Sequence, residues 1–471
     1  MKKIIVIFST LLLTVQLFAK NPVDDFSNNK MLENASVSLL VKDLGTNQPI
    51  YQYRPKTSII PASTLKLVTT ATALELLGPN FHFETKLEID GTINADSVLN
   101  GNLYIRGGGD PTLGSDCFKT ADFLKSWVEA VKNAGIRKIN GKIIADASIF
   151  DDEGVNPKWT WEDIGNYYAA GAYGISYLDN TFRLTLRSDI IGSKPEITKT
   201  TPEIPGLIID NQLRSTKIGF DSAYFYGAPH SNTRSIYGEI PAFRTAFVVK
   251  GDIPNPGLLL AQHLNDRLRQ SGIIITLPPT DKDGVSTNRR VIYTHDSPPL
   301  SAIITEINIH SNNLYAEHLF RYLALKKFHA GSSTGAVQVI KSFWKSKGLP
   351  VEQLFMYDGS GLSPVNAVSA NFFVELLTYM KTMSKYSDVF FNSLPIAGES
   401  GTLSGLLKNT PLQGKVHAKS GTISRVKCYA GYIEIKGKNY VFALMVNNAN
   451  GSSKAVTAKI EEFLLSLNAE Q

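Results

Sequence analysis

The sequence reads Pro61-Ala62-Ser63-Thr64-Leu65-Lys66 at the junction between a predicted strand pair and a predicted helix. Upstream, residues 35–41 predict a strand, and residues 51–53 predict its hairpin partner across a short turn. Downstream, residues 64–77 predict a helix that ends at Gly78, because the apolar residues recur at helical spacing: Leu65, Val68, Ala71, Leu74 and Leu77. The pattern therefore places Ser63 at the N-terminus of a helix.

Ser63 and Lys66 form a candidate nucleophile and base. Residues i and i+3 lie on one face of a helix, so the Lys66 amine is within reach of the Ser63 hydroxyl. The same spacing also occurs at residues 27–30 and 342–345, and an ordinary N-cap serine is the alternative at Ser63. Only the Ser63 pair opens a periodic helix directly after a strand pair and a proline.

Two further polar motifs lie in the C-terminal half of the chain. Ser311-Asn312-Asn313 falls between predicted helices at 300–309 and 313–326, and His417-Ala418-Lys419-Ser420-Gly421-Thr422 precedes a predicted strand at 429–435. Hydroxyl, amide and ammonium groups of this kind can bind a substrate and move a proton.

The pattern of apolar and polar residues changes between residues 81 and 298. This region predicts helices at 122–134 and 257–271 among short strands divided by Gly, Pro and Asn: 86–89, 102–105, 142–146, 182–187 and 243–249. Helical periodicity then returns, with a predicted helix at 335–347. The chain closes with a predicted strand at 440–446 and a predicted helix at 453–467. The order predicts an α/β (α+β) domain that is split in sequence by a long β-rich insertion.

Composition excludes several functional classes. The 471 residues carry a net charge of +6 without a long basic run, which argues against a nucleic-acid partner. No CxxC or HExxH motif occurs, so neither a metal site nor a cofactor is expected. Cys117 and Cys428 are expected to be two free buried thiols, with a disulfide bridge as the alternative.

The N-terminus has the layout of a secretory signal peptide. Lys2 and Lys3 precede an apolar run at 4–18, and the small residue Ala19 follows. The run is shorter than the roughly 20 residues that a spanning helix needs, although an uncleaved anchor is the alternative. We therefore expect residues 1–19 to be removed, and the mature protein to be periplasmic or associated with the cell envelope without a transmembrane helix.

In chain order, the three polar motifs resemble the S-x-x-K, S-x-N and K-[TS]-G elements of penicillin-binding proteins and serine β-lactamases. Four more segments are similar to the D-alanyl-D-alanine carboxypeptidase/endopeptidase family, the low-molecular-mass class C penicillin-binding proteins: Gly107–Leu113, Trp159–Asp163, Tyr357–Ser363 and Leu394–Leu403. The resemblance runs from about residue 35 to about residue 450, nearly the whole mature chain.

This resemblance implies a penicillin-binding/serine β-lactamase-like transpeptidase fold. Residues 28–80 and 299–471 would form the discontinuous catalytic domain, and residues 81–298 would form one or two inserted domains. The implied substrates are peptidoglycan peptides, and the implied inhibitors are β-lactams. A serine β-lactamase and a non-catalytic β-lactam-binding or wall-binding protein are the alternatives. The presence of both Ser63 and Lys66 argues against a binding-only protein.

The family also implies a role for each matched residue. Ser63 would attack the carbonyl of the penultimate D-Ala, and Lys66 would accept the hydroxyl proton. Ser311 would relay a proton to the leaving amine, Asn313 would hold the substrate backbone, and Lys419 would supply positive potential. A second cation in a partly dry pocket lowers the pKa of Lys66, which suits a base.

The remaining roles concern substrate binding. Ser420, Gly421 and Thr422 would bind the terminal carboxylate, and the backbone amides of Ser63 and Thr422 would form the oxyanion hole. Asp163 would contribute to recognising the amino group of a diaminopimelate residue, with an ordinary turn aspartate as the alternative. Pro364 replaces an arginine that is common in the family, while the four tryptophans are expected to pack in the core or at its rim rather than stack on sugars.

Overall fold

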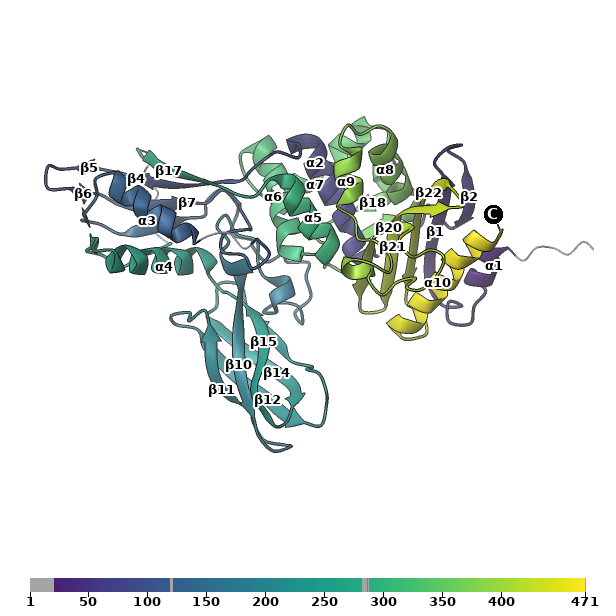
Figure 1. The fold of residues 1–471 in the computed structure, drawn as a ribbon, viewed down its shortest axis with the longest axis horizontal. Coiled ribbons are helices and arrows are strands. Elements are labelled where there is room, and N and C mark those ends of the chain that lie inside the picture. Colours follow the sequence, from purple (N-terminus) through teal and green to yellow (C-terminus); the bar gives the residue numbers. More distant parts are fainter. Residues whose placement is uncertain (1–20, 119–121, 282–285, 287, 471) are drawn as a thin grey trace, which may run out of the picture.

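The computed structural model describes residues 21–118, 122–281, 286 and 288–470, so the predicted signal peptide lies outside the described residues. The molecule is elongated (Figure 1). One end holds a large sheet between helices, and the other end holds several small sheets with two helices beside them. None of the helices in the described ranges combines the length and the apolar character needed to cross a bilayer.

The large sheet has five antiparallel strands in the order β2-β1-β22-β21-β20. The strands predicted near both ends of the chain are confirmed as β1 (Ser36–Asp43), β2 (Pro49–Tyr53), β21 (Val426–Ile435) and β22 (Lys438–Asn447). β20 (Val416–Ile423) was not predicted, and the motif at 417–422 lies within it rather than before a strand. Its polar Lys419 and Ser420 are buried, so the strand lacks the alternation of apolar and polar residues that the sequence reading relied on.

Both faces of this sheet are covered by helices. Along β22, Ala443 and Met445 face the core shared with α2 and α8, whereas Phe442 and Leu444 face α1 (Pro22–Ser27) and α10 (Ser453–Glu470). Side chains alternate between the two faces of a strand, so a strand that is apolar at every position is buried on both sides. The termini of the described chain therefore close one face of the sheet.

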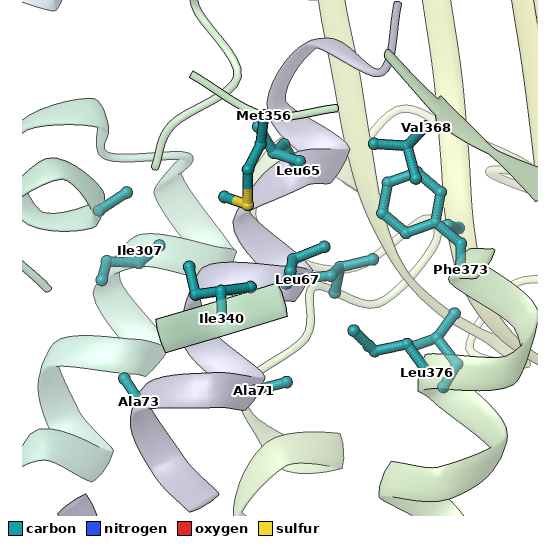
Figure 2. Packing of buried hydrophobic residues seen from close by; sticks show 14 of the residues in the cluster. Leu65, Leu67, Ala71, Ala73, Ile307, Ile340, Met356, Val368, Phe373 and Leu376 are labelled. Carbon is teal, nitrogen blue, oxygen red and sulfur yellow. The ribbon is translucent and has the colours of Figure 1, made fainter. Parts of the chain in front are cut away.

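Helix α2 (Lys66–Leu77) lies at the centre of the other layer, and it follows a 3-10 turn at Ala62–Leu65. Its residues from Lys66 to Leu74 are all buried. Figure 2 shows Leu67 and Ala71 among side chains that come from the surrounding helices. These helices are α5 (Leu300–His310), α6 (Asn313–Phe328), α7 (Ser333–Ser346) and α8 (Ala370–Thr382), and α9 (Ser387–Asn392) packs against α5 and α8. Contact on every side fixes the position of the residues at the start of α2.

Two paired strands connect the five-stranded sheet and its helices to the inserted region. β4 (Glu84–Ile89) and β17 (Arg290–Asp296) run antiparallel in the sheet β17-β4-β7-β9, with β7 at Leu103–Arg106 and β9 at Ile143–Asp146. The predicted helices are confirmed beside it as α3 (Phe123–Asn133) and α4 (Pro256–Gln270). The domain boundaries at 80 and 298 stay a prediction. The pairing of β4 with β17, which lie next to these positions in the sequence, agrees with it.

Two further sheets extend from this region (Figure 1). One has the order β11-β10-β15 and the other the order β12-β14-β13, and they share a core with α3 and α4. Their strands are β10 (Thr181–Ser188), β11 (Glu196–Thr201), β12 (Ile208–Thr216), β13 (Tyr224–Gly227), β14 (Thr233–Pro241) and β15 (Arg244–Asp252). Short strands complete the fold: β3 (Ser58–Ile59), β5 (Thr92–Ile93), β6 (Val98–Asn100), β8 (Lys138–Ile139), β16 (Ile274–Ile275), β18 (Leu354–Phe355) and β19 (Ala367–Ser369).

The two cysteines are both free thiols, as expected. Cys428 is buried in β21, but the expectation that both are buried is wrong for Cys117, which is exposed. Cys117 lies in a polar loop, where its Sγ donates a hydrogen bond to Glu306 Oε1 at 3.2 Å. Partial burial and the adjacent Glu306 together raise the pKa of this thiol to about 12, so Cys117 is not an activated nucleophile.

Helix α2 provides a matched pair for a stability test. Leu67→Ala removes a fully buried side chain, and we expect it to lower the free energy of unfolding by about 2–5 kcal/mol. Leu76→Ala truncates an exposed leucine of the same helix and is expected to change it by less than about 0.5 kcal/mol. Calorimetric unfolding of both variants measures the difference; equal losses would contradict the central position of α2.

Candidate active site

Ser63 lies in a tight turn directly before α2. The preceding residue, Ala62, has a positive φ of 46°, which is uncommon for a residue with a side chain. The turn is held from within, because Thr64 Oγ1 donates a hydrogen bond to the Pro61 carbonyl at 2.6 Å. It is also held from outside, because a Cβ on Gly361 would lie 2.0 Å from the Ala62 carbonyl oxygen. Close packing thus presents a half-buried Ser63 at a fixed place.

Lys66 is fully buried beneath Ser63, and its Nζ contacts three oxygens. They are Ser63 Oγ at 3.0 Å, Asn313 Oδ1 at 2.6 Å and the backbone carbonyl of Ser360 at 2.7 Å. The first contact is the one that the i, i+3 spacing predicted, and the second brings the first and second sequence motifs together. One amine therefore connects α2, α6 and the loop at residues 358–363.

The Lys66 pKa is lowered from its ordinary value to about 7, because burial removes water from the ammonium form. Two buried carboxylates, Asp358 and Glu317, oppose this shift by stabilising the positive charge. The amine is therefore present in both protonation states near neutral pH, which is the property that a general base requires.

These two carboxylates also shape the loop that faces Lys66. Glu317 accepts hydrogen bonds from the backbone amides of Gly359 and Ser360 at 2.7–3.1 Å. Asp358 accepts bonds from Trp159 Nε1 and from the amides of Gly361 and Ser363, among others. Burial raises the pKa of both groups, that of Glu317 to about 7. Together they aim the Ser360 carbonyl at the amine.

The second motif forms the turn between α5 and α6. Ser311 adopts the left-handed conformation that ends α5, and the Asn312 side chain caps α6 by accepting a bond from the Tyr315 amide at 3.2 Å. Asn313 is the first residue of α6, and both ends of its amide are engaged. Its Oδ1 accepts from Lys66, and its Nδ2 donates to the Tyr168 carbonyl at 2.8 Å.

The third motif lies on β20, the edge strand beside the Ser63 turn. A Cβ on Gly421 would lie 2.5 Å from the Pro61 carbonyl oxygen and 3.1 Å from the Ser63 amide nitrogen, so only glycine permits this approach. Lys419 is fully buried, and its Nζ donates to the Ser420 carbonyl at 2.9 Å. Burial, together with the nearby Lys66, lowers the pKa of Lys419 well below its ordinary value.

The hydroxyls of Ser420 and Thr422 on this strand have different hydrogen-bond partners. Ser420 Oγ donates to Thr402 Oγ1 at 2.8 Å and is nearly buried, whereas Thr422 is exposed and its Oγ1 accepts from Lys427 Nζ at 3.0 Å. Of these two residues, Thr422 lines the cleft described below.

A cleft of ≈ 620 Å³ opens above Ser63. It is lined by residues from all three motifs and from the inserted region, including Ser63, Ser311, Asn313, Thr422, Asp163 and Tyr224. Asp163 lies in a turn, as the alternative reading held, and it also faces this cleft, where its Oδ2 accepts from Thr160 Oγ1 at 2.6 Å. Lys66 and Lys419 are fully buried and do not belong to the described lining of the cleft.

The sequence reading missed Glu317 and the Ser360 carbonyl. A signal for Glu317 existed, because it follows Asn313 by four residues and therefore lies on the same face of α6. The Ser360 carbonyl could not be identified, since a backbone acceptor leaves no trace in residue type. Within the described residues, neither His310 nor His417 forms a side-chain hydrogen bond with Ser63 or Lys66.

Comparison with known proteins identifies the family. The model of the D-Ala-D-Ala carboxypeptidase 3 (S13) family matches residues 19–468. The chain belongs to this family. It is therefore a serine-type D-Ala-D-Ala carboxypeptidase with a penicillin-binding-protein fold, and the resemblance drawn from its motifs is confirmed.

Individual relatives cover almost the whole enzyme. The D-alanyl-D-alanine carboxypeptidase DacB of Haemophilus influenzae is 28% identical over 95% of this chain and 93% of its own. A D-alanyl-D-alanine carboxypeptidase of Actinomadura sp. (strain R39) is 26% identical over 94% of this chain and 84% of its own. The crystal structure of H. influenzae penicillin-binding protein 4 superimposes with a TM-score of 0.83 at 24% identity, covering 95% of this chain and 99% of that one.

A substitution at Gly421 tests the contact between β20 and the turn that carries Ser63. Gly421→Ala forces the strand away from Pro61 and Ser63, and we expect kcat/KM for release of D-Ala from a D-Ala-D-Ala peptide to fall about 100-fold. Gly405→Ala is the matched control, because a Cβ there meets nothing within 4 Å. Unchanged kcat/KM in Gly421→Ala would show that this close approach is not needed.

Proposed function

We propose that the enzyme cleaves D-Ala-D-Ala peptides of peptidoglycan through an acyl-enzyme on Ser63. The hydrogen bond between Ser63 Oγ and the buried Lys66 Nζ carries the proposal, because it joins a nucleophile to an amine whose pKa is about 7. The peptide carbonyl carbon gains a bond to Ser63 Oγ and loses its bond to the nitrogen of the terminal D-Ala. Water then releases the acyl group and restores the serine.

The contacts of Lys66 support a definite route for the proton. A neutral amine has two N–H groups and one lone pair. Asn313 Oδ1 and the Ser360 carbonyl oxygen carry no proton, so each accepts a hydrogen bond from one of the two N–H groups of Lys66. The lone pair is then directed at Ser63, whose hydroxyl donates to it before the attack. The ammonium formed in this way returns the proton, with Ser311 proposed as the relay to the leaving amine.

The remaining roles follow from positions around the cleft. The amides of Ser63 and Thr422 are proposed to hold the oxyanion, and the Thr422 hydroxyl to bind the terminal carboxylate. Lys419 would supply positive potential in its protonated form, which a substrate carboxylate bound nearby would favour against the effect of burial. We further propose that Ser420 acts through the hydrogen bond that its hydroxyl donates to Thr402.

The wider setting is also a proposal. One crystal structure of H. influenzae penicillin-binding protein 4, 25% identical to this chain with a TM-score of 0.76, holds a β-lactam, and we propose that β-lactams likewise acylate Ser63. Cross-linked peptides would be attacked by the same apparatus, giving endopeptidase activity. The layout of residues 1–19 supports export to the periplasm or cell envelope.

Covalent capture tests the nucleophile. Incubation of the full chain with benzylpenicillin is expected to add the mass of one drug molecule, and Ser63→Ala to remove this adduct while leaving the fold intact. Ser342→Ala is the matched control, since Ser342 belongs to one of the other S-x-x-K sequences. Intact-protein mass spectrometry reads the result. Hydrolysed drug without an adduct would favour a β-lactamase instead.

The state of Lys66 sets the dependence on pH. The amine accepts a proton only when neutral, and its pKa is about 7, so kcat/KM is expected to rise with pH through about 7. Hydrolysis of a D-Ala-D-Ala peptide measured between pH 5 and 9 gives the profile. A flat profile across this interval would contradict a titrating base.

A further inference from the structure

An exposed aromatic face lies beside the cleft on the sheet β12-β14-β13. Tyr224 of β13 pairs directly with Tyr237 of β14, and their exposed fractions are 46% and 49%. Tyr226 follows Tyr224 by two residues and therefore points to the same side, whereas Phe225 between them is buried in the core. Three tyrosines thus occupy the outer side of these two strands.

Trp161 adds a fourth ring from the loop after the buried Trp159. Its ring is stacked on that of Tyr226, with centroids 6.3 Å apart and planes at 29°, and Tyr226 in turn packs edge-on against Tyr237 at 5.7 Å. Trp161 is 62% exposed. The expectation of packing in the core or at its rim is confirmed for Trp127, Trp159 and Trp344, which are buried, whereas the exposed Trp161 lies outside the core.

Polar groups border these rings on β12. Gln212 lies opposite Tyr237, and Asp210 lies opposite Ser235 in the parallel register. Gln212 Nε2 donates to Asp210 Oδ1 at 2.7 Å, and Ser235 Oγ donates to Asp210 Oδ2 at 3.3 Å. An amide and a carboxylate are thereby held beside the rings, where they can bind hydroxyl groups of a ligand.

The aromatic face is continuous with the cleft. Tyr224 lines the cleft together with Ser63, and so does Thr160, the neighbour of Trp161 in the chain. A substrate that extends out of the cleft on this side therefore passes over Tyr224 and reaches Trp161, Tyr226 and Tyr237. Exposed aromatic groups gathered at one place on a soluble domain mark an interaction site.

We propose that this face, formed by Trp161, Tyr224, Tyr226 and Tyr237, binds sugar rings of the glycan strand that carries the stem peptide. The C–H face of a pyranose packs on an aromatic ring, while its hydroxyls bind tyrosine, amide and carboxylate groups. The inference rests on the proposed function, which places the stem peptide in the adjoining cleft. It gives the inserted region a direct part in selecting polymeric substrate.

Direct binding tests the proposal without catalysis. Peptide-free glycan strands of alternating N-acetylglucosamine and N-acetylmuramic acid are titrated into the full-length protein by calorimetry. Loss of one stacking ring in Trp161→Ala or Tyr237→Ala is expected to weaken binding about tenfold. Trp161→Phe should restore most of the affinity, and Phe243→Ala, which removes a ring that is 68% exposed outside this face, should leave it unchanged.

Kinetics with two substrates give an independent reading. On a short soluble D-Ala-D-Ala peptide, both alanine variants should match the wild type. On a glycan-linked stem peptide, KM should rise about tenfold with kcat unchanged. If the wild-type protein fails to bind glycan, or if the variants bind it as well as the wild type does, the proposal that the aromatic face binds glycan is contradicted. If the wild type binds glycan but hydrolyses neither peptide, the proposed function is contradicted, while glycan binding by the aromatic face is still supported.

Discussion

The structure depends on the burial of one amine. Lys66 Nζ lies in the interior with bonds to Ser63, Asn313 and the Ser360 carbonyl, so it connects three segments that are far apart in the sequence. A buried charge is costly unless it is compensated, and this cost explains both the lowered pKa and the two carboxylates beneath the loop. The same feature that weakens the ammonium form supplies the base that the proposed mechanism needs.

The architecture around this amine serves to hold it in place. Packing on all sides of α2 fixes the helix that carries Lys66, and the close approaches at Gly361 and Gly421 fix the turn that carries Ser63. The paired strands β4 and β17 connect the inserted region at a defined position, so that Tyr224 can line the same cleft as Ser63. The inserted region thus supplies part of the lining of the cleft that contains Ser63.

Sequence reasoning found the groups whose residue type is distinctive at a fixed spacing, such as Ser63 with Lys66. It placed most helices and strands, because apolar periodicity reports burial directly. It missed β20, since the buried polar Lys419 breaks that periodicity, and it missed Glu317, whose role arises only when α6 packs against the loop at 358–363. The contact of Trp161 with Tyr226 joins a loop to a strand far along the chain, which a local pattern does not contain.

The central claim is that Lys66 exchanges its proton near neutral pH inside the folded enzyme. Nuclear magnetic resonance of protein labelled with ¹⁵N at lysine Nζ, compared with a Lys66→Met variant, measures this directly. The account predicts one lysine resonance that titrates near pH 7 and is absent from the variant. A spectrum in which the Lys66 resonance titrates only near the ordinary lysine value of about 10.4 would contradict it.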